Sequence, residues 1–121
     1  MDSTFNDDER LYRAVLPKDM YWKNDGTLSS AAFCDKYGLS VERGHYRKIE
    51  DVIETMRERK FRGSLVSVKV ATCKDVEAVV KYKPSPNSEY HSEIHGSEEK
   101  ALLSNKQRKK IAAGARVEGK L

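Results

Sequence analysis

Two of the three histidines in the chain flank a glutamate in the stretch PNSEYHSEIHG, which begins at Pro86. If this stretch is an extended strand, His91, Glu93 and His95 lie on one face of it, while Ile94 points towards a core. Two imidazoles that titrate near neutral pH can act as the acid and the base of a hydrolysis or an RNA cleavage, and a carboxylate can hold one imidazole in the required tautomer. These three residues are therefore the candidate catalytic group.

Three other interpretations of the same stretch stay open. The histidines can be ordinary structural or surface residues, or the stretch can be a binding loop to which Tyr90 contributes. Alternatively, one helical turn can bring the two imidazoles, which are four residues apart, to a metal ion. The metal interpretation lacks an identifiable third ligand, and the residue order differs from the HExxH zinc motif. We therefore expect no metal site and no cofactor.

A basic segment near the C-terminus is the second candidate site. The whole chain has 23 Lys and Arg against 19 Asp and Glu, a net charge of +4, but the acidic residues crowd the start. The candidate binding residues in the basic segment are Lys106, Arg108, Lys109 and Lys110. Such a segment can contact phosphate groups or an acidic partner. The alternative is a solvated helix face whose lysines serve solubility.

Arg13 and two serines suggest a further activity. Arg13 in LYRAV, together with Ser29 and Ser30 in SSAAF, resembles the arginine of the first strand and the later serine-rich strand of ADP-ribosyltransferase toxins. The resemblance implies a transferase, with these three residues as binding residues. The alternative is that Arg13 is an ordinary strand arginine whose guanidinium pairs with a carboxylate.

A broader resemblance covers most of the chain. The segments SSAAFCDKYGLSVER and PNSEYHSEIHG, followed by a basic helix, are similar to a family of small uncharacterised bacterial proteins that share an SSxAF, LSVxR and NxxHxEI arrangement. The matching residues are Ser29, Ser30, Phe33, Ser40, Arg43, His91 and Glu93. The resemblance implies one domain in a bacterial or mobile-element setting and supplies no catalytic residue. It adds Arg43 to the candidate binding residues.

The length and composition indicate a single soluble domain. The chain has 121 residues, of which 35% are charged and 38% hydrophobic, and it lacks the long apolar run of a membrane span. Its start, MDSTFNDDER, lacks the basic and apolar regions of a signal peptide, so we expect a cytoplasmic protein without membrane contact. In that setting Cys34 and Cys73 are expected to be reduced thiols, with a disulfide as the alternative.

The positions of the helices and strands follow from hydrophobic periodicity. Alternation predicts strands at 11–17, 39–43, 64–72 and 77–84, and apolar residues at three- and four-residue steps predict a helix over 46–60 that includes Tyr46. Ser104 and Gln107 stand at capping-box spacing, which predicts a second helix from 104 to 116. Residues 18–38 are expected to be mostly loop with a short helical turn at 29–33. The linker TCKDVE is expected to pair the last two strands.

This order of elements predicts an α+β fold. We expect a small antiparallel or mixed sheet of about four strands with two main helices on one face. Residues 11–117 form the predicted domain, preceded by an acidic segment at 1–10, flexible or ordered, and followed by a C-terminal tail at 118–121.

Three hypotheses for the function remain. The first is a small basic, non-enzymatic interaction module, a component of a bacterial operon or defence system. It would bind nucleic acid, or a protein partner encoded nearby, through polar loops and the basic C-terminal helix. The second is a small nuclease-like or transferase enzyme that uses His91 and His95 as an acid–base pair. The third is an antitoxin or immunity protein.

Overall fold

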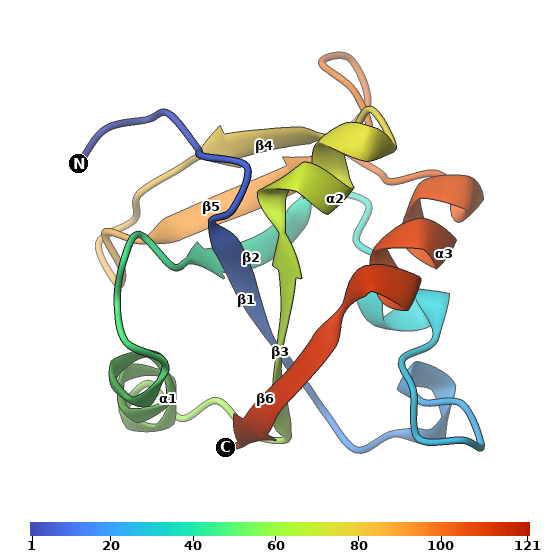
Figure 1. The fold of residues 1–121 in the computed structure, drawn as a ribbon, viewed down its shortest axis with the longest axis horizontal. Helices are drawn as coiled ribbons and strands as arrows, with labels where there is room; N and C mark the ends of the chain where they lie inside the picture. Colours follow the sequence, from blue (N-terminus) through green and yellow to red (C-terminus); the bar gives the residue numbers. More distant parts are fainter.

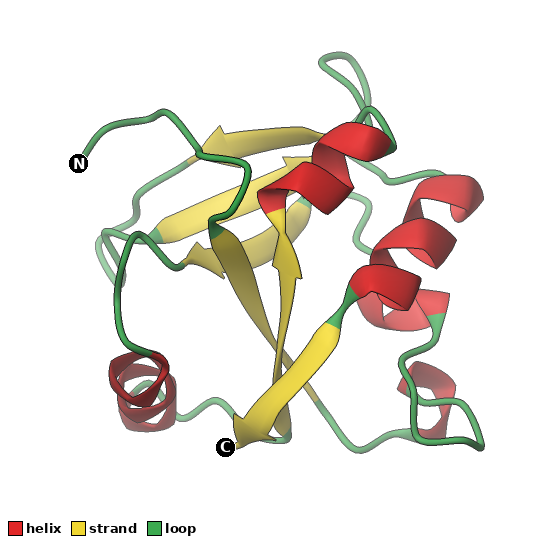
Figure 2. Cartoon of the chain, in the orientation of Figure 1, coloured by secondary structure: helices red, strands yellow, loops and turns green.

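A six-stranded sheet forms the centre of the computed structural model, which describes all 121 residues (Figures 1 and 2). Its strands are β1 (Arg10–Val15), β2 (Leu39–Arg43), β3 (Ser64–Lys69), β4 (Val79–Tyr82), β5 (His91–His95) and β6 (Arg116–Lys120). Their order is β4-β5-β2-β1-β3-β6, and every neighbouring pair is antiparallel. The predicted α+β class and antiparallel sheet are confirmed, but the expected number of about four strands is wrong.

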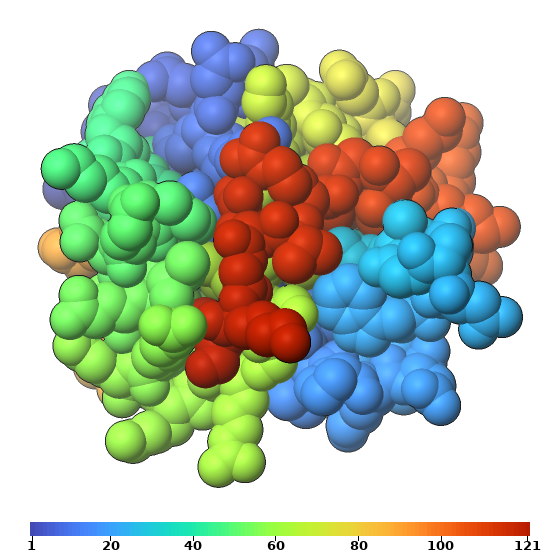
Figure 3. Space-filling model, turned by 60° about the horizontal axis from the view of Figure 1, so that its bottom comes forward, coloured from blue at the N-terminus to red at the C-terminus, as the bar shows by residue number.

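The strand β6 was not anticipated from the sequence. The helix α3 (Asn105–Gly114) ends two residues earlier than expected, and the backbone is already extended at Ala115. Residues 116–120 then pair with β3 along the edge of the sheet. Figure 3 shows this red C-terminal segment running between the green segment that contains α1 and the blue segments that follow β1. The strand carries little apolar alternation, because Val117 is its one large hydrophobic residue and is itself 50% exposed.

A short helix replaces the end of the third predicted strand. The strand β3 ends at Lys69, and α2 (Val70–Asp75) begins immediately after it. The backbone amide of Val70 donates to the carbonyl of Glu9, and Val70 and Cys73 are buried on the inner side of the helix. As a result β3 and β4 are not neighbours, because β4 pairs with β5 at the opposite edge of the sheet. The expected pairing of the strands on either side of TCKDVE is therefore wrong.

The helices cover both faces of the sheet, whereas one face was expected. The helix α1 (Ile49–Glu58) packs Val52 and Met56 against Tyr12 and Leu65. The larger core on the other face gathers residues of β1, β2, β3 and β5 with α2, α3 and two 3₁₀ helices, η1 (Asp19–Tyr21) and η2 (Ser30–Phe33). Figure 1 accordingly shows α1 apart from α2 and α3. This division arises because alternate residues of β1 and β3 point to opposite faces and each face receives buried hydrophobic residues, Leu11, Val15, Val66 and Val68 on one face and Tyr12 and Leu65 on the other.

The structure also bears on the predicted capping box, the helical turn at 29–33 and the state of the two cysteines. The capping box is present, since Ser104 accepts from the Gln107 amide and the Gln107 side chain accepts from the Ser104 amide. The helical turn expected at 29–33 corresponds to η2. Cys34 and Cys73 are free thiols, and burial raises the pKa of Cys73 to about 12. No helix has the length and apolar character that crossing a bilayer requires.

Candidate functional site

The three candidate catalytic residues lie on one face of β5. This strand places His91, Glu93 and His95 on the face opposite to Ile94, whose side chain is fully buried in the core. The neighbouring strand β2 contributes Ser40, which pairs directly with Glu93. The geometry expected of an extended stretch is therefore present, and whether it performs catalysis stays a prediction.

The ring of His95 is held by Glu93. Its Nε2 lies 2.8 Å from the Oε1 of Glu93, and the ammonium of Lys83 lies 3.3 Å from the same oxygen. A carboxylate only accepts hydrogen bonds, so this contact places the proton of His95 on Nε2. Burial acts to raise the pKa of Glu93, but hydrogen bonds from His95 and Lys83 outweigh it and lower that pKa below its ordinary value. Gly38 packs over the pair, where a Cβ would lie 2.6 Å from the His95 Nε2.

The ring of His91 has different partners. Its Nδ1 lies 2.8 Å from the carbonyl oxygen of Lys83, and its Nε2 lies 3.4 Å from the Oγ of Ser40. Because a carbonyl only accepts, Nδ1 carries the proton in the neutral ring and Nε2 presents its lone pair towards Ser40. A strand rises about 3.3 Å per residue, so the Cα atoms of His91 and His95 are about 13 Å apart. The two imidazoles therefore have separate surroundings.

Arg13 and Ser29 bond to backbone carbonyls. The Nε of Arg13 donates to Ala32 at 3.1 Å, and one terminal nitrogen donates to the carbonyl of Ser40 at 2.8 Å. These partners are carbonyls, whereas the alternative interpretation of Arg13 gave it a carboxylate partner, and burial lowers the pKa of its guanidinium. Ser29 donates to the carbonyl of Met20 at 2.5 Å, while Ser30 begins η2. Arg13 thus holds the long loop after β1 against the sheet, and Ser29 joins two parts of that loop.

Arg43 is enclosed by the N-terminal segment. Its side chain is 1% exposed and forms two 2.8 Å hydrogen bonds with the carboxylate of Glu9. Its remaining donors reach the carbonyl oxygens of Asp2 and Thr4, and the guanidinium lies 4.1 Å from the ring centre of Phe5. Four of its five N–H donors bond to residues 2–9, so Arg43 holds this segment on the sheet.

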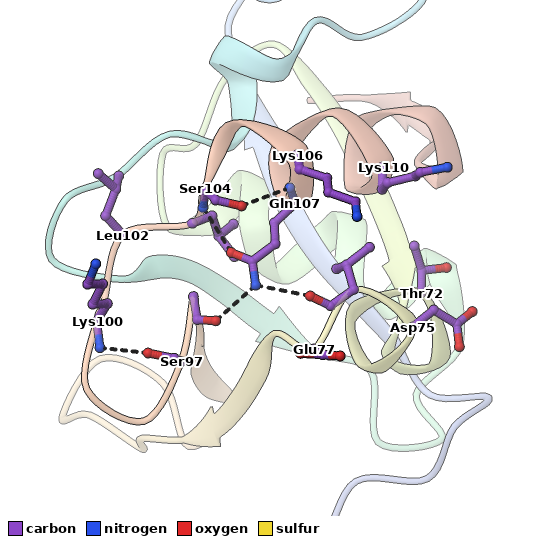
Figure 4. A pocket seen from close by; sticks show the side chains of 13 residues that line it. Thr72, Asp75, Glu77, Ser97, Lys100, Leu102, Ser104, Lys106, Gln107 and Lys110 are labelled. Carbon is purple, nitrogen blue, oxygen red and sulfur yellow. Dashed lines mark hydrogen bonds between the residues drawn. The ribbon is translucent and has the colours of Figure 1, made fainter.

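A polar cleft lies between α2, α3 and the loop after β5 (Figure 4). Its volume is about 1010 Å³, and three of its thirteen lining residues are hydrophobic. Lys100, Lys106 and Lys110 line it, and none of them forms an ion pair. The side-chain amide of Gln107 donates to the carbonyls of Val76 at 3.1 Å and Gly96 at 2.9 Å. These bonds fix α3 against the floor of the cleft.

The four basic residues predicted on the C-terminal helix divide into three groups. Lys106 and Lys110 border the cleft. Lys109 is exposed outside it. Arg108 is half-buried and donates to the Leu103 carbonyl and to Asn105.

The sequence did not single out Lys100, Thr72 or Asp75 as part of this site. They reach the cleft because residues 70–75 are helical and the loop after β5 folds back onto α3.

A second cavity, of about 410 Å³, lies beside the turn between β2 and α1. The turn closes with a 3.0 Å bond from the Arg47 amide to the Gly44 carbonyl, and its central residues, His45 and Tyr46, have φ of 44° and 65°. Left-handed backbone costs a non-glycine residue about 1–2 kcal/mol. Tyr46 was expected on the buried side of a helix, but α1 begins at Ile49 and Tyr46 is 84% exposed. Burial therefore does not offset the strain.

Comparison with protein-family models, curated proteins and solved structures finds no match to this chain. The observations that bear on function therefore come from the histidine face of β5, the cleft between α2 and α3, and the cavity beside the turn at residues 44–47.

Proposed function

We propose that the chain is a basic, non-enzymatic interaction module that binds nucleic acid through the cleft between α2 and α3. The supporting observation is the set of three lysines, Lys100, Lys106 and Lys110, that border one polar cleft without an ion-pair partner. A lysine paired with a carboxylate contributes little net potential, whereas unpaired lysines around one depression attract phosphate groups. The volume, lining and charge of the cleft together favour a polyanion over an apolar ligand.

Hydroxyl groups in the cleft add to this preference. The Ser97 Oγ accepts from the amides of Glu99 and Lys100, and the Ser104 Oγ accepts from the amide of Gln107. Each hydroxyl hydrogen is therefore still available to a phosphate oxygen.

Two carboxylates, from Asp75 and Glu77, line the side of the cleft opposite to α3 (Figure 4). They repel phosphates, so we place the sugar–phosphate backbone along α3. Contacts of this kind position a nucleic acid without reading its sequence.

The direct test is binding of fluorescently labelled single-stranded and duplex RNA and DNA, followed by anisotropy. Three lysine–phosphate contacts predict that affinity falls about 20- to 40-fold between roughly 50 and 200 mM salt. The double variant Lys106→Glu/Lys110→Glu should bind at least tenfold more weakly, because it replaces attraction by repulsion.

The matched control is Lys48→Glu/Arg62→Glu. It makes the same change in net charge at two exposed residues that line neither cavity and form no ion pair. The proposal requires this control to bind close to the wild-type affinity. If both double variants weaken binding equally, or if the affinity does not depend on salt concentration, the cleft is not the site of nucleic-acid binding.

A second candidate function is supported by the surroundings of His91. The Lys83 carbonyl fixes the proton on Nδ1 and leaves Nε2 free to act as a general base towards Ser40 or a substrate hydroxyl. A nuclease-like or transferase enzyme built on this histidine predicts that His91→Ala abolishes turnover of a model RNA or nucleotide substrate while the chain stays folded. The control is Lys48→Ala, which removes an exposed side chain that lines neither cavity and lies in a different part of the fold. Turnover that survives in His91→Ala rejects this alternative.

A further inference from the structure

The cavity beside the strained turn is separate from the cleft that we propose for nucleic acid. None of its lining residues borders that cleft, and its volume of about 410 Å³ lies within the range of small-molecule sites. It is formed by the segment before β1, the first residues of β1 and the turn at residues 44–47. We propose that this cavity is a nucleotide-binding site, which takes an aromatic base with a phosphate group attached.

The turn presents two aromatic rings for the base. The rings of His45 and Tyr46 lie 5.4 Å apart at an interplanar angle of 56°, and the Tyr46 hydroxyl accepts from the Asn6 side chain at 2.5 Å. The exposed Tyr46 is therefore fixed by its backbone and by one hydrogen bond. Strained residues of this kind concentrate at binding sites, where the strain displays a side chain that the core does not use. An exposed ring held in place offers a stacking platform to a planar base.

The close fit of the turn against β1 sets the depth of the cavity. The amide of Gly44 donates to the carbonyl of Arg10 at 2.8 Å, and a Cβ on Gly44 would lie 2.9 Å from that oxygen and 3.2 Å from the ring of Tyr12. Only a residue without a side chain allows the turn to approach β1 so closely. Tyr12 and Arg10, which the turn approaches here, both line the cavity.

Two guanidinium groups line the cavity without an ion pair. Arg47 lies 3.5 Å from the ring centre of Tyr90 and donates to the carbonyls of Arg43 and Gly44, which fixes its orientation. Arg10 donates to the Ser67 hydroxyl at 3.0 Å. Carbonyls, hydroxyls and aromatic rings do not neutralise a guanidinium, so its positive charge can still attract an anionic ligand. The planar arrangement of its donors also matches the oxygens of a phosphate.

The two carboxylates that line the cavity, those of Glu9 and Asp8, differ in whether their charge is neutralised within the fold. Both oxygens of Glu9 accept from the buried Arg43, and one of them also accepts from the His45 amide at 3.2 Å. Its charge is therefore neutralised within the fold. Asp8 is exposed, forms no ion pair and opposes an incoming phosphate. Because Asp8→Asn removes this repulsion, it should strengthen nucleotide binding.

The test is a calorimetric and NMR titration of the intact chain with AMP, GMP, CMP and UMP and with the matching nucleosides. We expect at least one nucleotide to bind, more tightly than its nucleoside. Loss of a base–aromatic stack weakens binding about tenfold or more, so Tyr46→Gly should bind at least tenfold more weakly, while Tyr46→Phe should retain the affinity within a few-fold. Because glycine relieves the positive φ, Tyr46→Gly should also raise the melting temperature by about 3 °C.

Two outcomes overturn the proposal. One is that no nucleotide binds the folded wild-type chain, and the other is that Tyr46→Gly, shown to be folded by its melting curve, binds as the wild type does. The variant Lys106→Glu/Lys110→Glu separates this site from the α2–α3 cleft. It should keep its affinity for the mononucleotide. If this variant alone loses that affinity, the mononucleotide binds in the α2–α3 cleft, and the assignment to the cavity beside the turn is wrong.

Discussion

His91 and His95 share one face of β5 but differ in the atoms that hold their rings. His95 is fixed by the carboxylate of Glu93 beneath Gly38, whereas His91 is fixed by the Lys83 carbonyl and faces Ser40. The two-residue period of a strand was enough to predict the shared face. The sequence also offered Glu93, on β5 itself, as the carboxylate that holds one imidazole. It could not predict the Lys83 carbonyl or Ser40, because these come from other segments that the fold brings to β5.

The contact between Glu93 and His95 predicts a pH dependence of stability. The folded-state pKa of Glu93 is lowered, so its contribution to the free energy of unfolding is fully present above the unfolded value of about 4.5 and is lost as the pH falls through the folded value. Urea unfolding of wild type and Glu93→Gln should therefore differ at pH 7 and converge as the solution is acidified. A difference that stays constant or grows on acidification would contradict the direction of this shift.

The sequence predicts best the helices that have a sustained amphipathic pattern or a capping box. The helix α1 and the capping box of α3 follow directly from residue spacing. The sequence left β5 as one of several interpretations of its stretch. It missed α2, with six residues, and β6, with five, because each depends on contacts with distant segments. The backbone of α2 is held by Glu9, and β6 is held by pairing with β3. Short elements of this kind carry too little pattern of their own to be identified.

The N-terminal segment is held to the sheet mainly by one buried ion pair, which gives an element-scale prediction. Removing Glu9 leaves the guanidinium of Arg43 buried without its carboxylate, and breaking a buried pair in this way costs about 3–5 kcal/mol. Glu9→Ala should therefore lower the free energy of unfolding by about 3 kcal/mol or more in urea denaturation. The neighbouring change Asp8→Ala, at an exposed residue without an ion pair, should alter it by less than about 0.5 kcal/mol. Equal effects of the two substitutions would show that the pair does not hold this segment.

At the scale of the whole molecule, the fold places its polar surfaces apart. The helix α1 covers one face of β1 and β3, and the larger core covers the other face. The α2–α3 cleft and the cavity beside the strained turn share no lining residue, and neither is lined by His91 or His95. The charge of the C-terminal segment was visible in the sequence, but the cleft was not. It forms only because α2, α3 and the loop after β5 meet.

The central claim is that phosphate groups contact the lysines of the cleft, and the slope of log affinity against log salt concentration measures those contacts directly. Each phosphate-contacting lysine that is removed should reduce this slope by about one. The account predicts a slope smaller by about two for Lys106→Gln/Lys110→Gln than for the wild type, and an unchanged slope for Lys48→Gln/Arg62→Gln. Identical slopes for the wild type and the cleft variant would contradict it.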